Sequence, residues 1–212
     1  MIVFQIGFNK CATTALYHMF KRARVMALHG GGRYWRRQKH PAIMGKNPQL
    51  EIHNNIVEGR AALTGFADFQ AFFDMEYVAD PALPWIENFR HFRLFAEQYH
   101  DARFILNTRD KAAWLRSRAR HNNGRYIRRA MERTGRNRDA VLQMWSEDWT
   151  SHHAAVRTYF ADKPGRLIEF NIDHDDPQAL VDFFAPEMKL RARHWAMIRV
   201  TDEVAKDLNW TV

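Results

Sequence analysis

Short apolar runs alternate along the chain with segments whose apolar residues recur at helical spacing. The strand-like runs cover residues 2–6, 24–28, 62–66, 103–108 and 166–171. Helical spacing begins near Thr13 and Pro48, covers residues 88–99, 110–120 and 139–160, and returns after Asp176-Pro177. Strands alternating with helices of this length are typical of βαβ units. The pattern predicts an α/β fold: a single doubly wound domain over residues 1–212, with a central, mostly parallel sheet.

The excess of basic residues points to a negatively charged partner. The 212 residues include 32 Lys and Arg against 24 Asp and Glu, a net charge of +8, and most of the cations are arginines. Segment 109–138 alone has ten Arg and one Lys against Asp110 and Glu132. Because guanidinium groups pair as a fork with phosphate and sulfate oxygens, a polyanionic partner is expected. The arginine segment has two open interpretations, a solvated helical face or a basic wall of an acceptor cleft.

Three observations bear on location. No apolar run approaches the roughly 18 residues of a membrane span, and the first strand begins at Ile2, which leaves no room for a signal peptide. A single cysteine, Cys11, excludes an intrachain disulfide framework. These features predict a cytoplasmic protein.

The segment after the first strand, Gly7-Phe8-Asn9-Lys10-Cys11-Ala12-Thr13-Thr14, leads directly into a helix. Backbone N–H groups and the dipole at a helix N-terminus favour a bound phosphate. Lys10 can reach an oxygen of such a group, and the hydroxyls of Thr13 and Thr14 add donors. In the nucleoside-triphosphate loop the lysine comes immediately before Ser or Thr, whereas Lys10 precedes Thr13 by three residues. The segment therefore predicts a phosphate-binding loop of a different kind.

A second candidate anion site follows the strand at 103–108. Arg109 comes directly after that strand, and Ser117 lies eight residues later, two turns into the next helix. Open α/β sheets bind ligands at the carboxyl ends of their strands. A phosphate reached by both side chains would receive a charged fork and a hydroxyl donor.

Both motifs resemble those of sulfotransferases that use 3′-phosphoadenosine 5′-phosphosulfate (PAPS). Lys-Cys-Ala-Thr-Thr-Ala-Leu at residues 10–16 resembles the family's K-x-G-T-T-x-L core, with Ala12 in place of the usual glycine. Arg109 and Ser117 resemble its 3′-phosphate motif. The resemblance implies that the 5′-phosphate is held by Lys10, Cys11, Ala12, Thr13 and Thr14. It implies that Arg109 and Ser117 hold the 3′-phosphate.

The activity implied by this resemblance is in-line transfer of a sulfuryl group from PAPS to an acceptor hydroxyl or amine. Adenosine 3′,5′-bisphosphate (PAP) would be released, Lys10 would stabilise the leaving phosphate, and no metal would be needed. Two strand-end residues are candidate general bases for the acceptor: His29, which ends the second predicted strand, and Asp68, which follows the third. The choice between them stays open. His152-His153 and His174-Asp175-Asp176 are expected on the solvated surface.

Two other functions stay as alternatives. One is a small-molecule P-loop kinase, which the position of Lys10 disfavours. The other is a basic, non-catalytic nucleic-acid-binding protein, although the chain shows no recognition motif for nucleic acid. The acceptor is expected to be a small molecule or a carbohydrate, and the sequence indicates neither its identity nor the oligomeric state.

Overall fold

The central element of the computed structural model is a five-stranded parallel sheet. The structure describes residues 1–78, 80 and 82–196. The sheet has the order β2-β3-β1-β6-β7, formed by β1 (Val3–Gln5), β2 (Ala27–His29), β3 (Ala71–Phe73), β6 (Arg103–Thr108) and β7 (Leu167–Asn171). All of its strand pairs are parallel. The prediction of an α/β, doubly wound sheet is confirmed.

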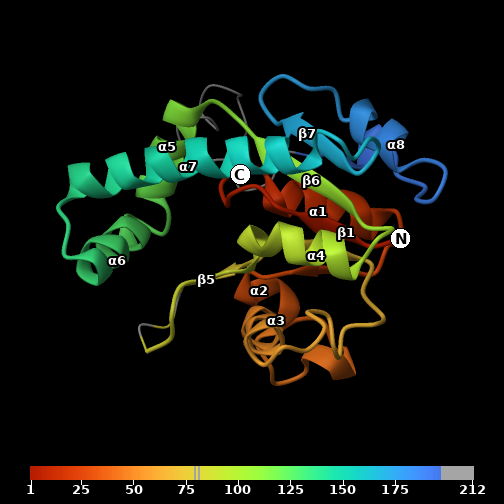
Figure 1. Cartoon of the computed structure of the whole chain (residues 1–212), viewed down its shortest axis with the longest axis horizontal. Helices are drawn as coiled ribbons and strands as arrows, with labels where there is room; N and C mark the ends of the chain where they lie inside the picture. Colours follow the sequence, from red (N-terminus) through yellow and green to blue (C-terminus); the bar gives the residue numbers. More distant parts are fainter. Residues whose placement is uncertain (79, 81, 197–212) are drawn as a thin grey trace.

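Helices cover both faces of this sheet (Figure 1). They are α1 (Thr13–Arg22), α2 (Gly32–Trp35), α3 (Pro48–Val57), α4 (Phe92–Gln98), α5 (Lys111–Arg120), α6 (Arg125–Thr134), α7 (Arg138–Phe160) and α8 (Gln178–Phe184). Short 3-10 turns occur at Pro41–Ile43, Asn88–His91 and Ala192–His194. In the described ranges, no helix combines the length and the apolar character needed to cross a bilayer.

Alternate residues of each strand feed two separate cores, because successive strand side chains point to opposite faces. Val3 and Ile105 pack with α1 and α8. Phe4 and Phe104 pack with α3, α4 and α7 on the other face. On this second face Phe4 stacks on the ring of Phe95 at 4.5 Å between centroids.

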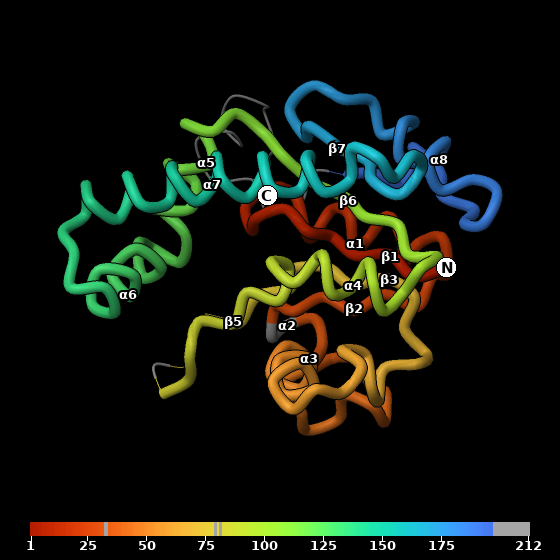
Figure 2. Tube along the Cα trace, in the orientation of Figure 1, coloured from red at the N-terminus to blue at the C-terminus, as the bar shows by residue number. Residues whose placement is uncertain are grey.

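A second layer of structure extends beyond the sheet. Helix α7 has 23 residues, about 34 Å of helix. Its first half packs against α5 and α6 instead of the sheet, and Figure 2 shows this end of the trace projecting past the strands. A two-stranded antiparallel pair, β4 (Glu76–Tyr77) and β5 (Ile86–Glu87), lies between the sheet and this projecting end.

Two predicted strands differ from the structure. Residues 62–66 form turns with Gly65 at φ 88°, so the strand predicted there is wrong, and the third strand is Ala71–Phe73. The second strand starts at Ala27 instead of residue 24, because Arg24 takes a left-handed φ of 64° that an extended strand cannot contain. Helices α2 and α6 and strands β4 and β5 were not among the predicted elements.

Candidate functional site

Strands β1 and β6 are neighbours whose connections leave in opposite directions. The chain leaves β1 through α1 toward β2 at one edge of the sheet, and it leaves β6 through α5–α7 toward β7 at the other. Ligands of open α/β sheets bind at such a switch point, outside the carboxyl ends of the strands. The loop after Gln5 and the turn at Arg109 both start there, because Gln5 pairs with Ile105 in the sheet. The two sequence motifs therefore lie side by side at the carboxyl edge of the sheet, where Arg109 contacts the Lys10 carbonyl.

The amide side chain of Asn107 fastens the loop to the sheet. Its Oδ1 accepts hydrogen bonds from the Gly7 backbone N–H at 3.1 Å and from Gln5 Nε2 at 2.7 Å. Its Nδ2 donates to the Cys11 carbonyl at 2.6 Å. A Cβ on Gly7 would lie 2.2 Å from the Asn107 carbonyl oxygen, so only glycine fits. The sequence reasoning missed Asn107, although an amide in an otherwise apolar strand was a visible signal.

Two more buried side chains hold the backbone around the loop. Trp114 Nε1 donates to the Asn9 carbonyl at 3.0 Å, and His152 Nε2 donates to the Ile6 carbonyl at 2.7 Å. Burial lowers the pKa of His152 to about 4, so it is neutral near pH 7. The expectation that His152 and His153 are solvated is wrong, because they are 5% and 2% exposed. Residues 174–176 are exposed as expected.

The loop backbone presents a row of available donors. Lys10 and Ala12 take left-handed φ values of 65° and 58°, and Ala12 immediately precedes α1. Throughout the described chain, the N–H groups of residues 11–14 donate to no carbonyl oxygen and to no side chain. A helix start with unused N–H groups favours an anion. Lys10 belongs to this loop, and its side chain is half-buried.

Arg109 reaches the same loop from the end of β6. Its Nη1 donates to the Lys10 carbonyl at 3.4 Å, and its Nη2 donates to Asp173 Oδ1 at 3.4 Å. Its Nε is buried and has no hydrogen-bond acceptor within the described residues. Ser117 lies in α5 as predicted and is 9% exposed. Within those residues it makes no hydrogen bond to Arg109 or the loop.

The ends of β2 and β3 bring a histidine and a carboxylate to the threonines of the loop. His29 Nε2 lies 3.3 Å from Thr14 Oγ1, and His29 Nδ1 accepts from the Gly31 N–H at 3.0 Å. Asp74 Oδ2 lies 3.6 Å from His29 Nδ1, and its Oδ1 accepts from Thr13 Oγ1 at 3.5 Å. His29 is thus placed beside the loop.

Asp68 does not lie at this site, and its placement beside the loop is wrong. It precedes β3, at the amino edge of the sheet, where it pairs with His40 Nε2 at 3.4 Å and is largely exposed. The residue that follows the third strand is Asp74, which sequence reasoning missed because it assigned that strand to residues 62–66.

Next to the loop, charged groups are buried in an aromatic cage. Arg118 is 1% exposed, and its guanidinium lies 5.0–5.3 Å from the rings of Phe8, Trp114, Tyr126 and Trp145. Its Nη2 donates to the Tyr126 hydroxyl at 2.8 Å. Tyr126 in turn donates to Glu76 Oε1, which also accepts from Asn9 Nδ2. This chain of contacts joins α5 and α6 to the loop.

Burial dominates the ionisation of this cluster. It raises the pKa of Glu76 to about 8, with Arg118 opposing the shift, and it raises the pKa of Tyr126 well above its ordinary value. Glu76 is therefore mainly protonated near pH 7. The second glutamate beside Arg118, Glu87, lies 3.7 Å from its Nη2.

The loop cysteine has no nucleophilic character. The Cys11 side chain is fully buried, and burial raises the pKa of its thiol. The thiolate is the reactive form, so burial disfavours reaction at the Cys11 sulfur. Over the described ranges, no three His, Cys, Asp or Glu side chains form a group that could hold a metal ion.

In comparisons with known proteins, no family model and no curated protein sequence matches this chain. The chemistry of the site therefore rests on its own geometry. That geometry places two sets of hydrogen-bond donors next to each other, the row of N–H groups with Lys10 and the Arg109 guanidinium. A histidine–carboxylate pair, His29 and Asp74, contacts Thr14 and Thr13 of the loop.

Proposed function

We propose that this protein is a PAPS-dependent sulfotransferase. The observation that carries the proposal is that two sets of N–H donors, neither with an acceptor among the described residues, lie next to each other at the switch point. One set is the N–H groups of residues 11–14, and the other is the buried Nε of Arg109. A nucleotide with phosphates at both its 5′ and 3′ positions needs two such subsites. A nucleoside triphosphate carries its phosphates in one row and does not need a second, separate subsite.

The roles of the residues follow from their positions. PAPS would supply the sulfuryl group. The N–H groups of residues 11–14 hold the 5′-phosphate, and the Lys10 ammonium stabilises the negative charge that grows on it during transfer. Arg109 holds the 3′-phosphate, with Ser117 as the second donor of that subsite. His29, whose ring is oriented by the Gly31 N–H on Nδ1, is the candidate base for the proton of the acceptor hydroxyl or amine. The proposal includes a reducing, cytoplasmic setting, which suits a lone buried thiol.

Thermal unfolding with separate additions of PAP, AMP and ATP tests this function. A ligand at about 100 times its Kd stabilises the folded state by roughly 2.7 kcal/mol. We expect a clear rise of Tm with PAP, and little or none with AMP or ATP. Lys10→Ala should weaken the PAP response, whereas Lys189→Ala, which removes an exposed lysine outside the site, should leave it unchanged.

A second variant separates the two subsites. Arg109→Gln should reduce the PAP response toward that of AMP, because the 3′-phosphate loses its charged partner. A stronger response to ATP than to PAP would favour the kinase alternative. If PAP has no effect on Tm, the sulfotransferase proposal fails.

A further inference from the structure

A dense set of arginines on and beside α6 is not used by the donor site. Residues 125–138 contain six arginines and one acidic residue, Glu132. All six are exposed, and we refer to them as the arginine surface: Arg125, Arg128, Arg129, Arg133, Arg136 and Arg138. Of these six, Arg138 alone pairs with a carboxylate of the described chain, Asp139 at 3.9 Å. The surface therefore keeps most of its positive charge.

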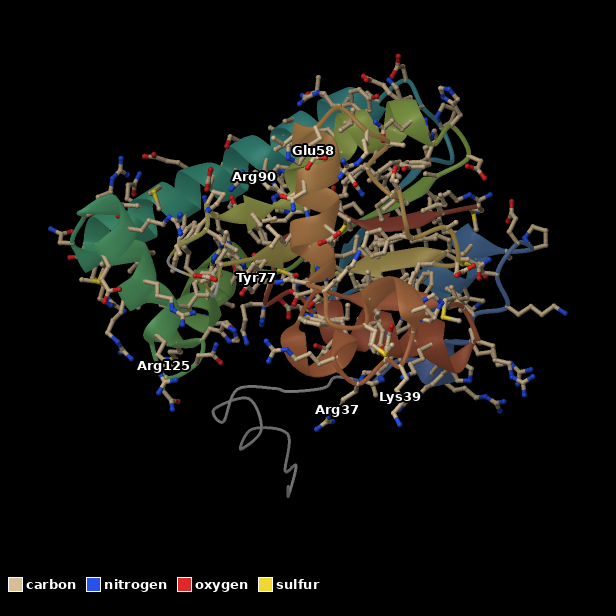
Figure 3. The ribbon with its side chains drawn as sticks, turned by 90° about the horizontal axis from the view of Figure 1, so that it is seen from below. Arg37, Lys39, Glu58, Tyr77, Arg90 and Arg125 are labelled. Atoms are coloured by element: carbon tan, nitrogen blue, oxygen red, sulfur yellow. The ribbon has the colours of Figure 1, made fainter. Side chains whose placement is uncertain are left out.

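This surface is carried on a fixed support. The opposite face of α6 is buried through Tyr126, Ile127 and Ala130, and Tyr126 packs against Trp145 of α7 at 5.7 Å between ring centroids. Figure 3 shows Arg125 at the edge of this end of the molecule, directed away from it. Since the helix is held from behind, the backbone positions that carry the arginines are fixed relative to one another.

The chemistry of the surface narrows the class of partner. The Phe, Tyr and Trp residues of segment 109–138 are Trp114 and Tyr126, 0% and 5% exposed. The ring beside the surface, Trp85, is half-buried, with the Arg133 guanidinium 5.9 Å from its centroid. The surface therefore offers no fully exposed ring on which the bases of a single-stranded nucleic acid could stack. The large exposed apolar side chains of the described chain, Met26, Met44 and Val57, all lie outside it. The surface therefore has no apolar face to insert into a membrane. A hydrophilic polymer with regularly spaced anionic groups fits these limits.

Helix α5 connects this surface to the donor site. It begins at Lys111, directly after Arg109 and Asp110, and it leads to α6 through residues 121–124. Arg116 and Arg120 are exposed along it. A polymer bound to α6 can follow α5 toward the switch point.

We infer that the arginine surface binds an acidic polysaccharide, a chain of sugars that bear carboxylate or sulfate groups. Such a polymer supplies anions to the arginines and hydroxyl groups to the donor site. Its role as the sulfuryl acceptor rests on the proposed function. Binding to the surface itself rests only on charge, exposure and the absence of exposed rings in this segment.

The test is binding of a fluorescent heparin dodecasaccharide by anisotropy over a series of salt concentrations. The triple variant Arg125→Gln, Arg128→Gln, Arg129→Gln removes three charges from the surface. We expect it to weaken binding at least about tenfold and to reduce the slope of log K against log salt by about two to three. The control, Lys189→Gln, Arg191→Gln, Arg193→Gln, removes the same charge from exposed positions after α8 and should bind as the wild type does.

Three results would overturn the inference: no binding, equal weakening in both triple variants, or tighter binding of a DNA duplex of equal total charge at the same salt. The PAP-dependent rise of Tm is measured on the same samples. A normal PAP response with no polysaccharide binding removes this inference and leaves the proposed function intact. Surface-dependent polysaccharide binding without a PAP response supports the docking surface, and the proposed function then fails.

Discussion

Ala12 is the position at which the loop departs from the pattern that it resembles. Its φ of 58° is in the left-handed region, where a Cβ costs roughly 1–2 kcal/mol and glycine costs nothing sterically. The usual glycine of the sulfotransferase-like pattern is thus explained by backbone geometry, and the alanine keeps the same geometry under strain.

Ala12→Gly should therefore stabilise the protein. Removal of the strain outweighs the added freedom of glycine in the unfolded chain, and we expect a gain of about 0.5–1 kcal/mol in the free energy of unfolding. Urea unfolding followed by circular dichroism measures it. Ala15→Gly, the same exchange inside α1, should lose about 1 kcal/mol. A loss at position 12 equal to that at position 15 would contradict the left-handed assignment.

Many of the site residues could be predicted one by one from the sequence, but the residues that hold the loop in place could not. His29 and Arg109 directly follow strand-like runs, and Lys10 lies in the loop four residues after one, so a local pattern reveals all three. Asn107 and Glu76 act through contacts 100 and 67 residues away along the chain, with Gly7 and Asn9 respectively. Pairings of this length follow from the order of strands in the sheet, which periodicity does not contain.

At the scale of elements, the hydrogen bonds from Asn107 of β6 to the loop after β1 fix the shape of that loop. Asn107→Ala removes the acceptor of the Gly7 N–H and the donor to the Cys11 carbonyl, and both groups are buried. Unpaired buried groups cost 1–3 kcal/mol each, so we expect a loss of about 2–4 kcal/mol in urea unfolding and a weaker response of Tm to PAP.

Asn137→Ala is the matched control for this change. Asn137 caps α7 by accepting from the Ala140 N–H at 2.9 Å, and its loss costs about 1 kcal/mol. It should leave the PAP response intact. Equal PAP responses in the two variants would show that the Asn107 hydrogen bonds do not shape the loop.

Predicted elements agree with the structure where the sequence marks their ends clearly. The strand at 103–108 and the helices starting at Thr13 and Pro48 were confirmed, because a sharp apolar run or a cap marks each one. Strand β3 has only three residues between Gln70 and Asp74, and so short a run does not stand out within the surrounding aromatic stretch. Helix α6 was missed because its many arginines mask a narrow apolar face, Tyr126, Ile127 and Ala130.

For the whole molecule, the buried Glu76 predicts a pH dependence of stability. Its pKa is about 8 in the folded state against an ordinary 4.5, so the folded protein retains a proton that the unfolded chain releases. This contribution is complete below about pH 4.5 and is lost as the pH rises toward 8, by up to about 1.4 kcal/mol per pH unit.

Glu76→Gln should remove this slope. The difference in free energy of unfolding between the variant and the wild type should shift in favour of the variant from pH 5 to pH 8, as urea unfolding at several pH values would show. Glu97→Gln, an exposed exchange on α4, serves as the control. A difference that stays constant with pH would contradict a protonated Glu76 near pH 7.

The many ties to the loop have a consequence for the entropy of binding. Fixing the backbone of one residue costs roughly 1–2 kcal/mol, and residues 7–12 are already fixed by Asn107, Trp114 and the neighbouring β1 anchor of His152. This ordering takes place when the chain folds, before any anion arrives. Under the proposed function, the 5′-phosphate would therefore meet a preorganised loop, and its binding would not be offset by the ordering of a flexible segment.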